Sequence, residues 1–297
     1  MKILIIGSKG FIGTYVFKYF RANQIEVWGC DVVTDYNDPS YFQVDATNAN
    51  YEEIFEAIAV DVCINCSGAA SVPESIKHPL RDYSLNVYNV ALLLEAIRKH
   101  APTCKLVNLS SAAVYGNPVS LPIEETQMVN PLSPYGHHKL YAEMLCKEYF
   151  NHFNVRSSSL RIFSAFGPGL KKQIFWDWSE KVKRTDLLEV IGTGKESRDF
   201  IYIDDLVHAI ECVVHGSSFE AEVINVANGE EVLISSAADI FKRCYPGSFN
   251  IRFNNSIRVG DPVNWKADIS RLQLFGYKQK VSFEDGLTRF IQWAVSE

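Results

Sequence analysis

The sequence predicts an α/β fold in which a doubly wound parallel sheet is followed by a smaller C-terminal lobe. Three observations lead to this prediction. Strand-like and helix-like segments alternate through the first half of the chain, and such alternation produces crossover units and a parallel sheet. The first strand-like segment, Lys2 to Ile6, is almost entirely apolar, which is typical of a sheet covered on both faces. A glycine-rich turn follows it at once.

The elements of the first half follow one another at short intervals. Apolar runs bounded by turn residues predict strands, and apolar residues at helical spacing predict helices. The expected strands are Lys2 to Ile6, Glu26 to Asp31, Val62 to Cys66 and Lys105 to Leu109, with a short strand before Asp45. The expected helices are Phe11 to Asn23, Tyr51 to Ala59, Asp82 to Lys99 and Leu132 to Phe153.

The pattern becomes less regular after about Phe163. Glycine-rich loops at 167–169, 192–194 and 216–218 separate shorter elements there. No internal repeat and no low-complexity linker occurs, so we expect two lobes that pack tightly against each other. A cleft between two lobes is the first place to expect a ligand.

Composition and charge narrow the class of protein. The 297 residues are 47% hydrophobic and 22% charged, as in an ordinary globular protein. The formal net charge is -6 and no block of Lys or Arg occurs, so we expect no nucleic acid and no membrane surface among the partners. No apolar run near the start is long enough for a membrane span or a signal peptide.

The cysteines point to a reducing compartment. Their number, 7, is odd and excludes a fully paired disulfide framework, so we expect a cytoplasmic protein. Cys63 and Cys66 are the one closely spaced pair, and they fall in an apolar strand-like segment. Because no second pair completes a tetrahedral site, no metal is expected.

Three glycines mark the turn between the first strand and the first helix. Gly7, Gly10 and Gly13 would let a pyrophosphate meet the backbone N–H groups of the helix start, although a tight turn also explains glycines. The context favours a dinucleotide site, because Asp31 ends the second strand about 20 residues later, where a carboxylate accepts hydrogen bonds from ribose. No Arg follows Asp31, which favours NAD over NADP. Asp45 is within reach of adenine, although an exposed loop aspartate explains it almost equally well.

A second group of residues suggests proton transfer. Tyr135 and Lys139 are four residues apart in a helix that Ser133 introduces, so they share one face of that helix. A positive charge beside a phenol favours the phenolate, which is the basic form. Ser111 follows the fourth long strand and is expected at the carboxyl edge of the sheet. A Tyr-x-x-x-Lys pair alone is usually an ordinary helix surface, but here it follows a dinucleotide motif and an edge serine.

Taken in order, these motifs resemble those of the extended short-chain dehydrogenase/reductases, in the NAD-dependent epimerase/dehydratase family that acts on nucleotide sugars. The similarity extends over nearly the whole chain. The motifs are Gly7/Gly10/Gly13, Asp31, Asn65 to Ala70, Ser71 to Ser75, Asn86, Ser110 to Gly116, Tyr135 with Lys139, Leu160 to Phe163, Gly167 to Gly169, Arg198 to Asp205, Asn225 with Val226, Arg258 to Pro262, and Gly276.

The resemblance implies roles for the matching residues. Tyr135 is the acid/base for the sugar hydroxyl, Lys139 lowers its pKa and holds the nicotinamide ribose, and Ser111 assists the proton transfer. The cofactor is NAD, and the residues expected to bind it are Gly7, Gly10, Phe11, Ile12, Gly13, Asp31, Asp45, Ala46, Cys66, Ser67, Gly68, Tyr135 and Lys139. The residues expected to bind the nucleotide sugar are Ser111, Tyr135, Ser164, Arg198, Arg258 and Asp261. Both arginines are expected on the diphosphate, and Asp261 on the nucleotide ribose.

The resemblance also implies how the chain is divided and assembled. Residues 1–164 are expected to form an NAD-binding, Rossmann-like domain and residues 165–297 a nucleotide-sugar substrate lobe, with part of 199–228 packing back on the first domain. A homodimer is expected, in which the helices Asp82 to Lys99 and Leu132 to Phe153 of two copies bury their long apolar faces against each other.

The choice of reaction depends on two alanines. Ala112 and Ala113 stand where dehydratases and decarboxylases of the family have acidic residues, and a methyl group cannot act as an acid or base. Two reactions remain: 4-epimerisation through a transient 4-keto sugar, and reduction of a 4-keto-6-deoxy sugar. Asp31 favours NAD, which an epimerase regenerates, so the epimerase is preferred. A non-catalytic dinucleotide-binding protein of the same fold is disfavoured, because Tyr135 and Lys139 are both present.

Two further residues bear on the sugar. Ser164 is shorter than the Asn that the family usually has there. Trp265 lies four residues after Asp261, a position that is near the sugar in the resembling epimerases. Because an indole takes the space of an N-acetyl group, we expect a plain or 6-deoxy hexose to fit better than an N-acetylhexosamine.

Overall fold

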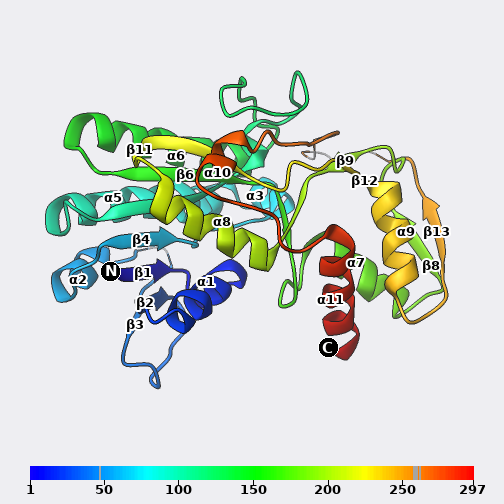
Figure 1. The fold of residues 1–297 in the computed structure, drawn as a ribbon, viewed down its shortest axis with the longest axis horizontal. Coiled ribbons are helices and arrows are strands. Elements are labelled where there is room, and N and C mark those ends of the chain that lie inside the picture. The colour runs from blue at the N-terminus through cyan, green and yellow to red at the C-terminus, as the bar shows by residue number, and fades with distance from the viewer. Residues whose placement is uncertain (47, 257–259, 261) are drawn as a thin grey trace.

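Seven parallel strands form the central sheet, with helices on both of its faces (Figure 1). The structure is a computed structural model that describes residues 1–46, 48–256, 260 and 262–297. The strands are β1 (Lys2–Ile6), β2 (Glu26–Asp31), β3 (Tyr41–Gln43), β4 (Val62–Asn65), β5 (Lys105–Ser111), β6 (Ser157–Ile162) and β11 (Glu220–Val226). Their order is β11-β6-β5-β4-β1-β2-β3, so the winding of the chain reverses between β1 and β4. The predicted fold class is confirmed, and ligands of such sheets bind beyond the carboxyl ends at this reversal.

The alternation of side chains along β1 explains why both faces of the sheet are covered. Ile3 and Ile5 pack into one apolar cluster, whereas Leu4 and Ile6 pack into another on the opposite face. The helices over the first face are α1 (Phe11–Ala22) and α8 (Ile203–Gly216), and those over the second are α2 (Tyr51–Ala57), α5 (Asn89–His100) and α6 (Pro134–Phe153). A strand buried on both sides must be apolar throughout, as the sequence of β1 is.

The helix expected at Asp82 to Lys99 begins earlier than predicted and is not a regular α-helix. It consists of α4 (Pro79–Tyr83), a π-helical turn η1 (Ser84–Tyr88) and α5. The short helix α3 (Val72–Lys77) precedes it, and a 3-10 turn η2 (Ala112–Val114) follows β5. Apolar spacing alone does not reveal a π turn, and such turns are frequent at functional sites.

The helix expected at Leu132 to Phe153 begins at Pro134 instead. Ser133 is its N-cap, and the Ser133 hydroxyl oxygen accepts a hydrogen bond from the Gly136 N–H at 3.2 Å. Pro134 occupies the first helical position, where its missing N–H is not needed. This cap fixes the start of the helix one residue before Tyr135.

A smaller lobe lies to the right of the sheet in Figure 1, and the arrows of β1 and β4 point toward it. Its pairs of strands are β7 with β10, β8 with β13, and β9 with β12. The bounds of its elements are β7 (Ser164–Phe166), α7 (Gln173–Val182), β8 (Leu187–Val190), β9 (Ser197–Arg198), β10 (Phe200–Tyr202), β12 (Val232–Leu233), α9 (Ile234–Cys244), β13 (Asn250–Phe253) and α11 (Phe283–Ser296). The short helix α10 (Ser270–Leu274) packs instead against β11 and α8 of the first domain.

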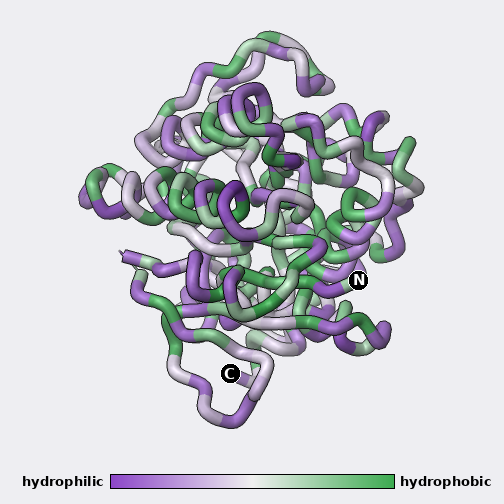
Figure 2. The backbone as a smooth tube through the Cα atoms, turned by 90° about the vertical axis from the view of Figure 1, so that its left-hand side faces the viewer, coloured by the Kyte–Doolittle hydropathy of each residue, from purple (hydrophilic) through white to green (hydrophobic). Residues whose placement is uncertain are grey.

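One continuous apolar core joins the sheet to this lobe. The cluster that contains Ile3 also contains Phe166, Phe175 and Phe200. The ring of Phe166 lies 5.3 Å from that of Phe175 and 5.9 Å from that of Phe200, centroid to centroid. Hydrophobic segments accordingly run through the middle of the molecule in Figure 2.

A buried ion pair ties α6 to the sheet. The Arg161 guanidinium, on β6, donates to Glu143 of α6 at 2.7 Å, and both side chains are buried. The Ser110 hydroxyl, on β5, donates to the other oxygen of Glu143 at 2.5 Å. Arg161 also donates to the Tyr115 hydroxyl at 2.9 Å and to the Glu125 carbonyl at 3.1 Å. The pair therefore joins one helix, two strands and two loops.

Glu143→Gln should strongly destabilise the fold. It leaves the Arg161 guanidinium buried without a counter-charge, and breaking a buried pair in this way costs about 3 to 5 kcal/mol. Urea unfolding measures the effect. Glu284→Gln, which removes an exposed partner of Arg243, is the control and should leave the midpoint nearly unchanged. A loss below about 1 kcal/mol for Glu143→Gln, the range of exposed pairs, would contradict a central role for this ion pair.

Candidate active site

The turn between β1 and α1 has no room for side chains. A Cβ on Gly13 would lie 2.0 Å from the carbonyl oxygen of Gly7, and a Cβ on Gly7 would lie 2.8 Å from the backbone nitrogen of Ser67. Gly7 also has a φ of 78°, in the left-handed region. Glycine is therefore required at both positions, and the helix start lies directly against the end of β4.

The backbone amides of this helix start point out of its end. The first intrahelical bond runs from the Thr14 N–H to the Gly10 carbonyl at 2.9 Å, so the amides of Phe11, Ile12 and Gly13 precede the hydrogen-bonded turns. Amides in this position, with the positive end of the helix dipole, attract phosphate. The geometry suits the predicted pyrophosphate site.

Asp31 closes the far side of the turn at the end of β2. One of its carboxylate oxygens accepts the Lys9 N–H at 2.8 Å and the other accepts the Val32 N–H at 2.7 Å. A hollow of about 480 Å³ next to it is lined by Val32, Gln43, Val44, Asp45 and Ala46. The structure thus brings Asp31, Asp45 and Ala46 to one edge, where the adenosine end of a dinucleotide is expected.

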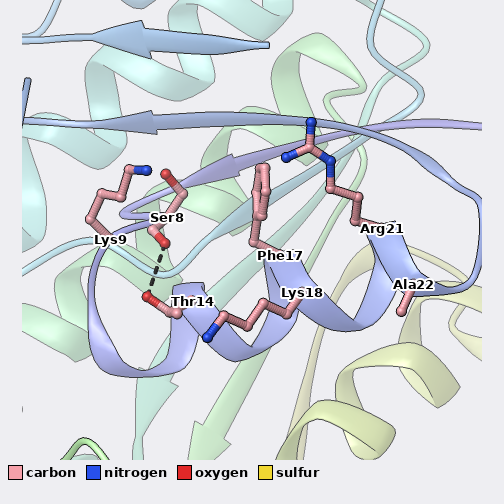
Figure 3. A pocket seen from close by; sticks show the side chains of 7 residues that line it. All are labelled: Ser8, Lys9, Thr14, Phe17, Lys18, Arg21 and Ala22. Atoms are coloured by element: carbon pink, nitrogen blue, oxygen red, sulfur yellow. Dashed lines mark hydrogen bonds between the residues drawn. The ribbon is translucent and has the colours of Figure 1, made fainter. Parts of the chain in front are cut away.

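A second hollow, of about 500 Å³, opens along the outer side of α1 (Figure 3). Its lining is Ser8, Lys9, Thr14, Phe17, Lys18, Arg21 and Ala22. Two of its cations already have partners, since Lys9 pairs with Asp35 and Arg21 with Asp38. This hollow lies beside the glycine turn and contains none of the residues predicted to bind NAD.

The residues predicted to lie near the nicotinamide meet at the end of β4. A Cβ on Gly68 would lie 2.5 Å from Asn86 Oδ1 and 3.5 Å from Lys139 Nζ, so these three residues are close neighbours. Cys66 and Ser67 directly precede Gly68 and lie against the Gly7 turn. Residues from β4, η1 and α6 therefore meet at one point.

The predicted acid/base residues meet at the carboxyl end of β5. The Ser111 hydroxyl lies close to the Tyr135 phenol and acts to lower its pKa. Lys139 Nζ donates to the Leu109 carbonyl at 2.9 Å and lies 6.0 Å from the centre of the Tyr135 ring. Ser75, on α3, accepts the Tyr135 N–H at 3.1 Å, which further fixes the helix start.

Burial disfavours the charged forms of Tyr135 and Lys139. Desolvation raises the pKa of Tyr135 to about 12, although the nearby Ser111 hydroxyl favours the phenolate. Desolvation lowers the pKa of Lys139 to about 8, which leaves its ammonium form dominant at neutral pH. An ammonium beside the phenol stabilises the phenolate, so each charge makes the other less costly.

The residues predicted to bind the substrate lie in the second lobe. Ser164 begins β7, and its N–H donates to the Asp199 carbonyl at 3.0 Å. Arg198 lies with its guanidinium 5.5 Å from the centre of the Trp265 ring, and it donates to the Val263 carbonyl at 3.1 Å. The Trp265 indole N–H donates to the Gly116 carbonyl at 3.2 Å, beside η2. Arg198 is thereby linked to the loop that follows Ser111.

Two predicted substrate residues, Arg258 and Asp261, lie outside the residues that the structure describes. Within the described part of the chain, no three His, Cys, Asp or Glu side chains gather as a metal site would require. All seven cysteines are free, and burial raises the pKa of the Cys66 thiol to about 12. No helix in the described ranges is long and apolar enough to cross a bilayer.

The model of the NAD dependent epimerase/dehydratase family matches residues 3–227. This chain belongs to that family. Among curated relatives, a UDP-glucuronate 4-epimerase of Thermodesulfobacterium geofontis is 27% identical over 316 residues, which cover 98% of this chain and 95% of that protein. The UDP-glucuronate 4-epimerase 3 of Arabidopsis thaliana is 25% identical, over 98% of this chain and 76% of that protein.

Solved structures give the same picture for the fold of this epimerase/dehydratase family member. The UDP-glucuronic acid 4-epimerase of Bacillus cereus, in complex with UDP-glucuronic acid and NAD, has a TM-score of 0.90 and 26% identity, over 100% of this chain and 99% of that one. A UDP-N-acetylglucosamine 4-epimerase of Methanobrevibacter ruminantium has a TM-score of 0.89 and 25% identity, over 99% and 98%.

The residues of this family member fit a bound NAD. The turn at Gly7 and Gly13 offers a cradle that any Cβ would fill. Asn86 is 1% exposed, and neither polar atom of its amide has a hydrogen-bond partner among the described residues. Buried polar atoms of this kind are costly unless a ligand completes them. The orphaned amide next to Lys139 therefore suits a polar cofactor group.

Sequence reasoning gave no role to several residues that support this site. Asn86 was recognised only as part of a motif, and Asp82, His138 and Glu143 were not singled out. Polar residues on the buried face of an otherwise apolar helix are a signal that could have found them. Their partners lie far away in the sequence, as in the bond between His138 and Asp82, 56 positions apart.

Asp31→Ala should weaken NAD binding relative to NADP, because the carboxylate that repels a 2′-phosphate is lost. The loss of charge-assisted hydrogen bonds predicts a fall of roughly tenfold in the ratio of the two affinities. Titration with each cofactor measures this ratio. Asp38→Ala, which removes the partner of Arg21 on the outer side of α1, is the matched control and should leave the ratio unchanged. Equal ratios in both variants would mean that Asp31 does not face the ribose.

Proposed function

We propose that this protein is an NAD-dependent nucleotide-sugar 4-epimerase that works through a transient 4-keto sugar. The observation that carries the proposal is the cluster of Ser111, Tyr135 and Lys139 at the carboxyl edge of the sheet. It occurs in a chain that matches several UDP-sugar 4-epimerases over nearly their full length. The cofactor is NAD, in keeping with the family and with the carboxylate at Asp31.

The alternatives are less well supported. Ala112 and Ala113 form the 3-10 turn after Ser111 and offer no second acid or base, which argues against loss of water or of carbon dioxide. Reduction of a 4-keto-6-deoxy sugar would use the same residues, but the relatives and neighbours described above are epimerases. An intact Ser111–Tyr135–Lys139 cluster disfavours a non-catalytic binding protein.

Residues of this chain carry out the proton transfer. NAD, when bound, would supply reversible hydride transfer at sugar C4. Tyr135 takes the proton from the C4 hydroxyl and gives it back to the same oxygen. Ser111 holds the phenol and shares the hydrogen bond with the substrate, and the Lys139 ammonium stabilises the phenolate. An ammonium held in this position stabilises the transition state of the proton transfer.

We assign the two halves of the chain to the two ligands. Residues 1–164, joined by part of 199–228, bind NAD, and residues 165–297 bind the nucleotide sugar. The contribution of β11 and α8 to the first sheet and its covering layer supports this division. Arg198 binds the diphosphate, for which a bidentate guanidinium is well suited, and Ser164 lies near the sugar. Arg258 and Asp261 remain predictions for the same ligand.

We also infer the setting in which the enzyme works. Seven free cysteines support a cytoplasmic location, and a net charge of -6 supports neither nucleic acid nor an anionic membrane as partner. An epimerised nucleotide sugar is an activated donor, which supports a role in polysaccharide biosynthesis. Cell fractionation, and analysis of surface sugars in a deletion strain, would test both inferences.

The reaction is tested by incubating the protein and NAD with a panel of UDP-, GDP-, CDP- and dTDP-sugars and following the products by NMR. Inversion at C4 without net formation of NADH is expected. Because Trp265 packs against Phe163 and the Gly116 loop, plain or 6-deoxy hexoses should react faster than N-acetylhexosamines. Consumption of NADH with a 4-keto sugar, and no inversion, would favour the reductase instead.

Tyr135→Phe should abolish turnover and leave NAD binding largely intact, because the ring still packs but the proton carrier is gone. Acid/base groups of this kind contribute roughly 10²- to 10⁴-fold to the rate. The measurement is kcat in the NMR assay, alongside a cofactor titration. Activity within about threefold of the wild type, far short of that range, would remove Tyr135 from its role.

We propose that the protein is a homodimer built on α4, α5 and α6. Exposed apolar side chains gather on these helices and on the turn η1 between α4 and α5. They include Leu80, Tyr88 and Met144, of which Met144 is 60% exposed. Light scattering should give twice the 33.6 kDa of one chain, and Met144→Glu should shift it toward the monomer. Met128→Glu, at a methionine that is 72% exposed in the loop before α6, is the control. A wild-type monomer at micromolar concentration would contradict the proposal.

A further inference from the structure

We propose that Asp82 and His138 form a buried positioning pair whose negative charge keeps the Lys139 side chain in its ammonium form beside Tyr135. The inference rests on the proposed function, because it assigns Lys139 to the nicotinamide ribose and to the phenolate. Neither Asp82 nor His138 touches the reacting atoms in this assignment. They act through Lys139.

The pair is short and buried. His138 Nδ1 lies 2.6 Å from Asp82 Oδ2, and Asp82 is 3% exposed. The other oxygen, Oδ1, has no hydrogen-bond partner among the described residues. Asp82 stands on α4, one helical turn before Asn86, and His138 directly precedes Lys139 on α6. The carboxylate therefore lies within the group of side chains that surround the acid/base residues.

Two carboxylates act on Lys139, and they differ in how they are neutralised. Glu143 is held by the guanidinium of Arg161, which is positively charged at every relevant pH. Asp82 is held instead by the imidazole of His138, which is not a permanent cation. Asp82 is thus the carboxylate whose charge is not cancelled by a permanent cation. The negative charge of Asp82 favours the protonated form of Lys139, whereas burial disfavours that form.

The other charged and titratable groups around the pair do not supply this charge. The ring centroids of Tyr83 and Tyr141 lie 5.5 and 6.1 Å from the centroid of the His138 ring. Cys66 adds only a thiol that burial keeps protonated. Elements packed against α6 carry charges that are paired with one another near the surface, namely Glu74 with Lys77 and His78 on α3, and Glu95 with Arg98 and Lys99 on α5.

The sign of the effect follows from the positions of the charges. The negative charge of Asp82 raises the pKa of Lys139 and of Tyr135, since it favours the protonated form of each. If that charge is removed, both groups lose their protons at lower pH. The alkaline limit of activity, set by loss of the Lys139 proton near pH 8, then moves to lower pH. A residue that only filled space would leave this limit in place.

Three variants separate charge, hydrogen bond and packing. Asp82→Asn keeps the shape and removes the charge, so the alkaline limit should fall by about one pH unit. His138→Leu removes the donor, and a buried carboxylate without a donor takes up a proton, so the limit should fall in the same direction. His138→Asn places an amide N–H near the position of Nδ1 and should restore the wild-type limit. His137→Leu is the control, because the His137 ring contacts the Ser133 carbonyl and not Asp82.

The variants are compared by two measurements on the full-length protein. One is the pH profile of kcat in the epimerase assay. The other is the pH dependence of the NAD dissociation constant, which reports on Lys139 without turnover. We expect the same downward shift for Asp82→Asn in both, with His137→Leu unchanged.

The two measurements also distinguish this inference from the proposed function. A shift in NAD binding without turnover of any sugar would refute the 4-epimerase and retain the pair. Turnover with the same alkaline limit in Asp82→Asn and the wild type would refute the pair and retain the epimerase. Equal shifts for His138→Leu and His138→Asn would also overturn it, because the hydrogen bond would then have no effect. If His138→Leu does not fold, Asp82→Asn and His138→Asn still show whether the pair sets the alkaline limit.

Discussion

The arrangement of the elements around the site depends on one constraint. The charge and the hydrogen-bond donors of a buried guanidinium must all have partners. Arg161 satisfies it with Glu143 on α6, with the Tyr115 hydroxyl and with a loop carbonyl, and Ser110 completes the carboxylate. Moving any of these elements would leave a charge unpaired in the interior, which is among the most costly defects a protein can have. Helix α6 is therefore held in one position on β5 and β6, and the meeting of Tyr135 with the end of β5 follows from that position.

The cofactor turn and the acid/base helix could be predicted from the sequence because both are local. Glycines at 7, 10 and 13 and the pair Tyr135 and Lys139 lie within single turns or helices, where spacing determines geometry. The π turn at Ser84–Tyr88 and the bond between Asp82 and His138 could not be predicted in this way. They depend on how segments far apart in the sequence pack, and apolar periodicity carries no information about such pairs.

The site brings together ionisable and polar groups whose burial is costly. They differ in how far neighbouring groups compensate that cost. Burial shifts both Tyr135 and Lys139 toward their neutral forms. The polar atoms of Asn86 and one oxygen of Asp82 lack partners among the described residues. Groups in this condition gain more from a ligand than exposed groups would, because their desolvation has already occurred. Much of the preparation for catalysis is therefore built into the fold.

The shared aromatic core has a consequence for how substrate enters. Phe166, Phe175 and Phe200 belong to the same cluster as the first strand, so swinging the second lobe away as a rigid body would expose that cluster to water. Hinge opening is consequently disfavoured, so a nucleotide sugar would enter by local rearrangement of loops and not by movement of the whole lobe. A 4-keto sugar that has to turn over between the two hydride transfers would do so between two lobes whose relative position this core fixes.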